Sequence, residues 1–306
     1  MKILVMGTGA VGGYFGAKLA RAGEAVTFVA RGAHLDAIRA RGLRIRSSVE
    51  GESVVTAPAT ADPATTGPAD LILVCVKAFD TESAARALGP AVGPETVIVS
   101  LQNGVDNEEK LGAIVGTEHV LGGVAYLFAS IEAPGVIVHS LSGRIVFGEL
   151  DGSETPRARR IRETFARAGI PVELSPHIQR ALWEKYLMIV AHSGMTALTG
   201  CPLGVIRSVP ETRKMYRLIV EELGALAKAA GIELPPEAVD TVMTASDQLA
   251  PTVYSSLHYD LTRGKRLELE ALQGYAVRLG ERLGVPTPMC FAVYASLKPF
   301  VDGPPV

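Results

Sequence analysis

The chain has 306 residues, of which 48% are hydrophobic and 20% charged, and its formal net charge is −2. This composition is typical of a globular protein that is long enough to form two domains. No block of like charges points to nucleic acid or to a membrane surface, and we expect neither as a partner. No apolar run is long enough to span a membrane, and the N-terminal run is too short for a signal peptide. We therefore expect a cytoplasmic protein.

The first 30 residues have the layout of a dinucleotide-binding unit. An apolar run at 2–6 leads into Gly7-Thr8-Gly9-Ala10-Val11-Gly12, and a helix is predicted over 14–22, before a second strand at 25–30. In this motif Gly7 permits the tight turn, Gly9 lets a pyrophosphate approach the backbone, and Gly12 lets helix and strand pack closely. Free N–H groups at the start of the helix then bind the phosphates. We favour this interpretation over a purely structural glycine turn.

Arg31 stands nineteen residues after Gly12, where an NAD-binding chain usually carries an acidic residue. A guanidinium binds a 2′-phosphate in bidentate fashion, so the sequence favours NADP(H) over NAD. More arginines follow, and we interpret them as a solvated helix and strand face: Arg39, Arg41, Arg44 and Arg46.

Short apolar runs alternate with helical stretches up to residue 176, which predicts a parallel sheet. Further strands are expected at 43–57 (bent around Glu50-Gly51), 70–76, 96–101, 119–128, 135–140, 144–149 and 171–174, with a helix at 155–168. Helical periodicity then covers 177–199, 210–230, 236–250 and 266–283. The predicted fold class is α/β, with a Rossmann-type N-terminal domain (1–176) followed by a mostly α-helical C-terminal domain (177–306).

Two polar residues follow predicted strands at their carboxyl ends, the edge that faces the cofactor in such a sheet. Lys77 comes directly after the strand at 70–76, and its position alone fits a surface lysine equally well. Asn103 follows the next strand, where it offers a donor and an acceptor to a nicotinamide ribose or a substrate carboxylate. The alternative for Asn103 is an ordinary Asn-Gly turn.

Candidate residues in the helical part are harder to select. Burial of Lys185 among apolar neighbours would lower its pKa towards that of a useful proton donor, but the residues alone favour a snorkelling surface lysine. Ile189 and Ser193 share its helix face. Ser256 fits a helix cap or helix surface. Glu268 fits a solvated charge in a first helical turn, and periodicity does not select it over the nearby Glu270.

The histidines and cysteines predict no metal site. The six histidines show no HxxxH or HExxH spacing, and the three cysteines are far apart with no CxxC pair. We expect free thiols in a reducing compartment and no bound metal.

Taken together, these stretches resemble the ketopantoate reductase (2-dehydropantoate 2-reductase) family, whose members reduce a 2-oxo acid with NADPH in pantothenate and CoA biosynthesis. The similar segments follow the family order over nearly the whole chain: KILVMGTGAVGGYFGAKLA, VARGAHLDAIRARGL, LILVCVKAFDT, LQNGVDNE, LWEKYLMIVAHSGMTALTG, PTVYSSLHYDLTRGKRLELEALQG and GVPTP.

The resemblance implies a role for each matching residue. Lys185 would be the proton donor for the ketone oxygen, and Glu268 would hold its ammonium group. Arg31 would bind the 2′-phosphate of NADP(H). The other implied cofactor contacts are the loop from Gly7 to Gly12 with Lys77, Asn103, Ala129 and Glu268, and the implied substrate contacts are Asn103, Lys185, Ser193 and Ser256. The resemblance also leaves a homodimer open.

One departure from the family pattern concerns the substrate. The family carries asparagines four and eight residues after the lysine, and here these positions are Ile189 and Ser193. Isoleucine forms no hydrogen bond with a substrate hydroxyl. The predicted function is reduction of ketopantoate to pantoate, and the alternative is reduction of another, more apolar 2-oxo acid or ketone. Two further alternatives are oxidation of a 3-hydroxy acid and a non-catalytic NADP-binding sensor; Lys185 and Glu268 argue against the sensor.

Overall fold

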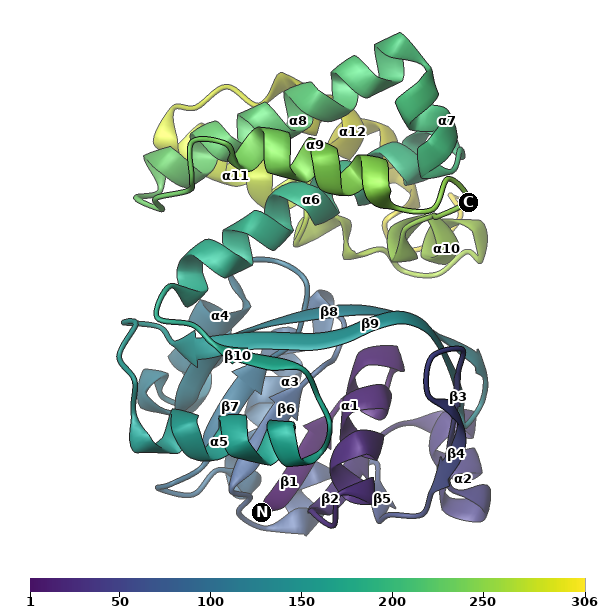
Figure 1. Ribbon diagram of the computed structural model, residues 1–306, viewed down its shortest axis with the longest axis vertical. Coiled ribbons are helices and arrows are strands. Elements are labelled where there is room, and N and C mark those ends of the chain that lie inside the picture. Colours follow the sequence, from purple (N-terminus) through teal and green to yellow (C-terminus); the bar gives the residue numbers. More distant parts are fainter. Residues whose placement is uncertain (306) are drawn as a thin grey trace. The chain divides into compact units, whose positions relative to one another are not determined.

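The structure is a computed structural model that describes residues 1–305 (Figure 1). These residues form two compact units. The first unit contains Met1–Gln102 and Asp106–Ile178, and the second contains Asn103–Val105 and the chain from Gln179 onward. No helix within residues 1–305 is long and apolar enough to cross a bilayer. The first unit is Rossmann-like and the second is mostly helical, which confirms the predicted fold class.

The first unit is built on one mixed sheet of ten strands within the described residues, in the order β4-β3-β9-β8-β7-β6-β1-β2-β5, with β10 paired to β9. Pairing is parallel from β5 to β8, as the sequence predicted, through β5 (Ala59–Thr60), β2 (Ala25–Val29), β1 (Lys2–Met6), β6 (Leu71–Val74), β7 (Val97–Ser100) and β8 (Val120–Ala133). Antiparallel pairs join β8 to β9 (Val136–Glu149) and β3 (Leu43–Ser47) to β4 (Gly51–Val55). The last strand is β10 (Val172–Leu174).

Helices cover both faces of this sheet, which explains why the central strands are apolar throughout. Side chains of α1 (Ala10–Arg21) and α5 (Pro156–Arg167) belong to one apolar cluster. Side chains of α3 (Thr81–Leu88) and α4 (Asn107–Val115) belong to another. The remaining helix of the unit is α2 (Gly32–Arg41), which follows β2.

The long pair β8–β9 corrects the sequence prediction of separate strands at 135–140 and 144–149. A single strand spans both segments. Ser142 has a φ of 66° and Gly143 a φ of 130°, and the register of β9 against β8 shifts nearby. The polar Ser-Gly step is therefore absorbed as a bulge within the strand and does not end it.

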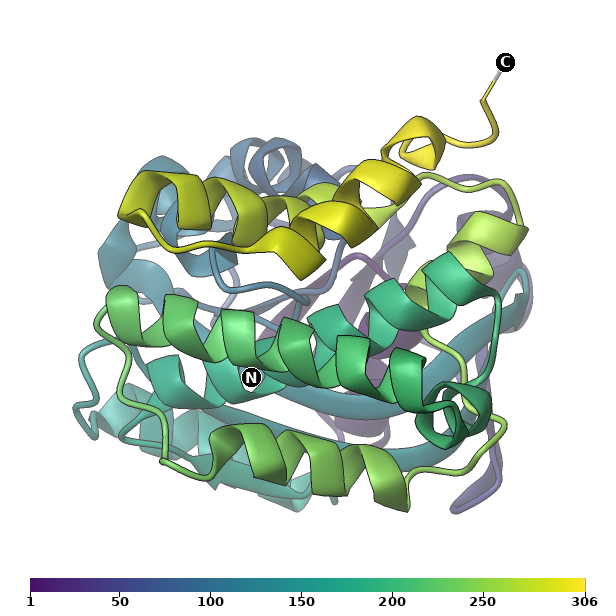
Figure 2. The ribbon, with the colours of Figure 1, turned by 90° about the horizontal axis from the view of Figure 1, so that it is seen from above.

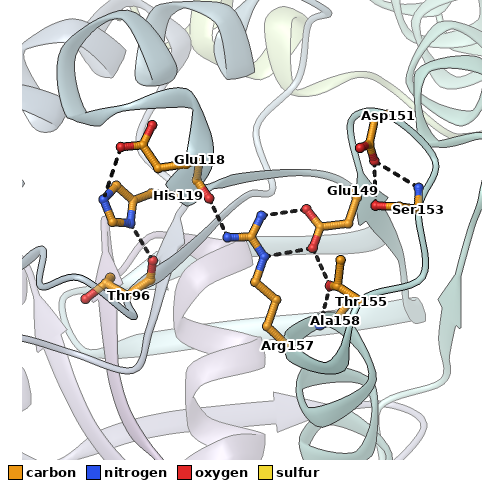
Figure 3. A network of polar contacts seen from close by, with 9 residues as sticks. All are labelled: Thr96, Glu118, His119, Glu149, Asp151, Ser153, Thr155, Arg157 and Ala158. Carbon is orange, nitrogen blue, oxygen red and sulfur yellow. Dashed lines mark hydrogen bonds and ion pairs between the residues drawn. The ribbon is translucent and has the colours of Figure 1, made fainter.

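An ion pair in the first unit holds the start of α5 against the end of β9 (Figure 3). Arg157 donates to both carboxylate oxygens of Glu149, at 2.7 and 2.6 Å, and Glu149 is only 5% exposed. Thr155 donates to the same carboxylate and also caps α5 by accepting from the N–H of Ala158. Each carboxylate oxygen is thus paired, which is the condition under which a buried carboxylate is tolerated.

The second unit packs its helices around α8 (Pro210–Ala229), as the view from above shows in green to yellow (Figure 2). The apolar side chains of α8 recur every three to four residues, from Tyr216 to Ala227, and are buried. Its neighbours are α7 (Leu203–Ser208), α9 (Ala238–Gln248), α11 (Gln273–Leu283) and α12 (Pro288–Leu297). The unit also contains α6 (Ile178–Thr199) and α10 (Ser256–Thr262).

Three of these helices were missed from the sequence, and one predicted helix is too long. α7 and α10 are too short to show a helical period, and α12 begins at Pro288, directly after the segment Gly284-Val285-Pro286, which indicates a break. The helix predicted over 266–283 begins only at Gln273, and Glu268–Glu270 forms a separate 3₁₀ turn before it.

Candidate active site

The three glycines of the loop after β1 meet different surroundings. Gly7 has a φ of +98°, and a Cβ there would lie 2.7 Å from the backbone N of Val76. A Cβ on Gly12 would lie 2.3 Å from the carbonyl oxygen of Gly7. A Cβ on Gly9 would meet no atom within 4 Å. Gly7 and Gly12 are therefore required by the packing of the protein itself, whereas Gly9 borders open space.

That open space lies at the N-terminus of α1. Gly9 is the N-cap residue, and it provides no side chain to cap the helix. The first turn holds no acidic residue, and the first helical backbone hydrogen bond is donated by Gly13 to the carbonyl oxygen of Gly9, at 2.8 Å. The N–H groups of Ala10, Val11 and Gly12 therefore precede the helical ladder. Together with the positive end of the helix dipole, they form a site suited to an anion such as a pyrophosphate.

Thr8 contributes to the loop in a different way from its neighbours. Its backbone N–H and its Oγ1 both donate to the carbonyl oxygen of Val29 at the end of β2, each at 2.9 Å. The residue is 3% exposed. Thr8 thus anchors the loop to the adjacent strand and has both donors engaged within the protein.

Arg31 follows β2 and is the N-cap residue of α2. Its side chain is exposed, and within residues 1–305 no carboxylate lies within ion-pair distance of its guanidinium. The later arginines are engaged: Arg44 pairs with Glu52 at 2.8 Å and Arg46 with Glu132 at 2.7 Å. Arg31 is thus a surface cation at the end of β2, the position from which a Rossmann-type chain contacts the adenosine ribose.

Lys77 lies half-buried after β6, where it is the N-cap residue of a 3₁₀ turn over Ala78–Asp80. The side-chain amide of Gln102 fixes this turn, because its Nε2 donates to the carbonyl oxygen of Val76 at 3.0 Å and to Oγ1 of Thr81 at 2.8 Å. Gln102 therefore ties the chain after β7 to both sides of Lys77. The sequence analysis did not single it out, although it directly precedes Asn103 at a strand end.

Asn103 and Ala129 lie in different units. Asn103–Val105 belongs to the helical unit, and Val105 packs against the apolar core of that unit. Ala129 is half-buried on β8, opposite His139 of β9. Asn103 is therefore grouped with the unit that carries Lys185, although in sequence it follows a strand of the sheet.

The structure separates the two glutamates that the sequence could not. Glu270 accepts hydrogen bonds from Arg278 at 2.6 Å and from the Tyr294 hydroxyl at 3.0 Å, and it also pairs with Lys298. Glu268 begins the 3₁₀ turn and is 6% exposed, which excludes a solvated charge. The two glutamates thus differ: Glu268 is a buried carboxylate, of the kind that is ordinarily paired, whereas Glu270 is partly exposed and engaged by Arg278 and Lys298.

Lys185 lies half-buried on α6, and its neighbours Tyr186 and Leu187 are almost wholly buried. Of the residues on the same face, Ile189 is half-buried and Ser193 is 1% exposed. The Ser193 hydroxyl donates to the carbonyl oxygen of Val190 at 3.3 Å and accepts from the side chain of Gln273 at 3.1 Å. It is thus engaged inside the helical unit.

Two serines before and within α10 have separate surroundings. Ser255 is the N-cap residue: its Oγ accepts from the N–H of His258 at 3.1 Å and from Oγ1 of Thr196 at 2.7 Å. Ser256 is the first helical residue and is exposed. Of the two, Ser256 therefore has the more accessible hydroxyl.

His192 is a second buried titratable group on α6. It is 6% exposed, and burial, with a smaller effect from the charge of Arg207, lowers its pKa to about 4. The imidazole is therefore neutral at pH 7.

No cluster of three or more His, Cys, Asp or Glu side chains within the described residues is placed to hold a metal ion.

Comparison with known proteins identifies the family. The model for "Ketopantoate reductase PanE/ApbA" matches residues 3–152, and the model for "Ketopantoate reductase PanE/ApbA C terminal" matches residues 177–300. The chain belongs to the ketopantoate reductase family. This confirms the resemblance seen in the sequence and places the chain among oxidoreductases.

Relatives and solved structures of this family match over nearly the full length. The chain is 31% identical to the uncharacterized oxidoreductase YkpB of Bacillus subtilis, over 97% of this chain and 98% of that protein. It is 31% identical to the 2-dehydropantoate 2-reductase of Mesorhizobium japonicum, over 97% of each. A solved PanE/ApbA family ketopantoate reductase from Ralstonia eutropha is 36% identical, covers 98% of each chain and has a TM-score of 0.91.

Proposed function

We propose that this family member reduces 2-dehydropantoate (ketopantoate) to pantoate with NADPH, in the cytoplasmic pathway to pantothenate and CoA. The observation that carries the proposal is that one unit contains both a half-buried Lys185 and a buried Glu268, the two residues to which the resemblance assigns proton donation. The uncapped N-terminus of α1 and the exposed Arg31 support NADPH as the cofactor.

Each residue has a defined task in this reaction. NADPH, when bound, supplies the hydride. Lys185 holds a proton at Nζ and delivers it to the ketone oxygen as negative charge develops there. Glu268 favours the charged form of that ammonium and orients it. Asn103 and Ser256 hold the 2-oxo acid, with no metal required.

A second candidate substrate is a more apolar 2-oxo acid or ketone. Two observations favour it: Ile189 has no polar atom in its side chain, and the hydroxyl of Ser193 is engaged by Gln273. A site without a partner for the substrate hydroxyl discriminates little in favour of a substrate that carries one.

The deciding experiment measures initial rates of NADPH oxidation with ketopantoate and with its analogue that lacks the hydroxyl. Lys185→Ala should lower kcat by about 10²–10⁴-fold. Lys228→Ala, which removes an exposed lysine from α8 of the same unit, should leave it unchanged. Nucleotide binding without turnover of any 2-oxo acid would contradict the proposal and favour a sensor. Turnover of the analogue alone would favour the apolar substrate.

The cofactor preference has its own test. A hydrogen bond to a charged group contributes about 1.5–3 kcal/mol, so Arg31→Ala should raise KM for NADPH about ten- to hundredfold. KM for NADH should not change, because NADH has no 2′-phosphate. Arg41→Ala is the matched control, since it removes an exposed arginine from the other end of α2. Equal effects of Arg31→Ala on both cofactors would argue against the 2′-phosphate contact.

A further inference from the structure

Buried hydrogen bonds join the helix that carries Lys185 to the segment that carries Glu268. Tyr186, the residue after Lys185, is 1% exposed, and its hydroxyl donates to the carbonyl oxygen of Leu272 at 2.6 Å. The N–H of Leu272 in turn donates to the carbonyl oxygen of Glu268 at 3.2 Å. A single residue, Leu272, therefore links the neighbour of the lysine to the backbone of the glutamate.

Gln273 forms a second connection one residue further along. Its Nε2 donates to the carbonyl oxygen of Val190 at 2.9 Å and to Oγ of Ser193 at 3.1 Å. Gly194 provides the space for this approach, because a Cβ there would lie 2.9 Å from the same nitrogen. A carbonyl, a hydroxyl and a glycine of α6 are thus arranged around one amide group.

The amide of Gln273 is not explained by packing alone. The side chain is 1% exposed, and its Oε1 has no hydrogen-bond partner in the part of the chain that the structure describes. An unpaired buried acceptor destabilises a fold relative to an apolar side chain of the same shape. What distinguishes the glutamine from an apolar residue of the same shape is the pair of hydrogen bonds that its Nε2 donates to α6.

We propose that Tyr186 and Gln273 are positioning residues that hold Lys185 in place relative to Glu268, and that Ser193 serves Gln273 and does not contact substrate. The inference rests on the proposed role of Lys185 as proton donor. The hydrogen bonds of Tyr186 and Gln273 join α6 to the segment 268–273 at two positions, Tyr186 and Val190, which lie on either side of Ile189. Two such contacts fix both the rotation of α6 about its axis and its position along that axis. A proton donor displaced by about 1 Å loses about a hundredfold in rate.

Two conservative variants test the positioning. Tyr186→Phe removes only the hydroxyl, and Gln273→Met keeps the length of the side chain without its donor. Each should lower kcat about ten- to hundredfold, leave KM for NADPH within about twofold, and shift the alkaline limb of the kcat–pH profile. In the proposed mechanism this limb reports loss of the proton that the donor delivers, so a displaced donor changes it.

Tyr216→Phe is the matched control. Tyr216 is 2% exposed in the same unit, on α8, and within the described residues its hydroxyl forms no hydrogen bond with α6 or with the segment 268–273. The control should retain wild-type kcat and the wild-type pH profile. If Tyr186→Phe and Gln273→Met behave like this control, the inference is wrong. Should Gln273→Met fail to fold, as judged by circular dichroism, Tyr186→Phe decides alone.

Ser193→Ala separates a positioning role from substrate contact. Loss of the hydroxyl leaves Gln273 bonded to Val190, so we expect a severalfold lower kcat with KM for the 2-oxo acid unchanged. A rise in KM for the 2-oxo acid with kcat unchanged would show a direct substrate contact and overturn the assignment.

Lys185→Ala distinguishes failure of this inference from failure of the proposed function. If that variant retains turnover, the proton-donor role is wrong and the positioning inference is wrong with it. If it loses turnover while Tyr186→Phe matches Tyr216→Phe, only the positioning inference fails.

Discussion

Gly9 and Gly12 should respond to the same substitution in opposite ways. An alanine Cβ at Gly9 would meet no protein atom within 4 Å, and the φ of −81° at Gly9 is accessible to alanine. Alanine is the poorer N-cap residue by about 0.5–1 kcal/mol, and the smaller entropy of its unfolded chain offsets about 0.4–1 kcal/mol of that loss. Gly9→Ala should therefore leave the melting temperature within about 3 °C of wild type.

The same methyl group should nevertheless obstruct the nucleotide. The methyl group projects into the space where we place the pyrophosphate, and it would hold the pyrophosphate away from the N–H groups of Ala10 and Val11. Losing one hydrogen bond to a charged group, at about 1.5–3 kcal/mol, weakens binding about ten- to hundredfold, and losing two weakens it further.

Gly12→Ala should instead damage the protein. Its Cβ would lie 2.3 Å from the carbonyl oxygen of Gly7 and 2.8 Å from Cγ1 of Val5, so the backbone must shift. Overpacking of this kind destabilises by about 1–3 kcal/mol, or several degrees in melting temperature.

Thermal unfolding and calorimetric titration with NADPH, performed on both variants, check the contrast. Wild-type affinity in Gly9→Ala would refute the placement of the pyrophosphate over Gly9. Unchanged stability in Gly12→Ala would refute the packing argument.

Three further changes test the energetics of the two units. Arg157→Met should lower the free energy of unfolding of the first unit by about 3 kcal/mol, since it leaves the buried Glu149 carboxylate without its ion pair; denaturant titration measures this loss. Glu222→Gln should destabilise the second unit by about 1 kcal/mol, because the two carboxylate oxygens accept from the first N–H groups of α12 at 2.7 and 2.9 Å; thermal unfolding against wild type is the check. His192, with a folded pKa of about 4 against 6.5 for the unfolded chain, should make wild type less stable as pH falls from 6.5 to 4, because only the unfolded state gains the proton there. The free energy of unfolding should fall by about 3 kcal/mol over this range, and in His192→Leu it should vary less with pH between 6.5 and 4.

The nucleotide-binding half was accessible from sequence because its logic is local. Strand, glycine loop, helix and second strand follow one another within 30 residues, and Gly7 and Gly12 stand where a Cβ would collide with backbone atoms. The place of Arg31 at the end of the second strand could be predicted by spacing alone, since one helix and one strand separate it from the glycine loop.

The arrangement of the helical unit depends on contacts between residues distant in sequence. Periodicity treated Glu268 and Glu270 alike, because both fall in one predicted helical stretch. The structure breaks that helix after Glu270 and engages Glu270 with Arg278 and Lys298, whereas Glu268 is buried. Which glutamate is engaged in ion pairs depends on Arg278 and Lys298, and Lys298 follows α12, a helix that was not predicted from the sequence.

The same reasoning applies to hydroxyl groups. In the sequence, Thr8 lies in the glycine loop and Ser193 lies on the same helix face as Lys185, and the resemblance implied ligand contacts for both. The donors of Thr8 are directed to Val29, and the hydroxyl of Ser193 is held between Val190 and Gln273. A spacing pattern shows where a hydroxyl lies along a helix or loop, but whether it is available to a ligand depends on partners 21 and 80 residues away in the chain. Hydrogen bonds to those partners determine where each hydroxyl is directed, and a local spacing pattern contains no information about them.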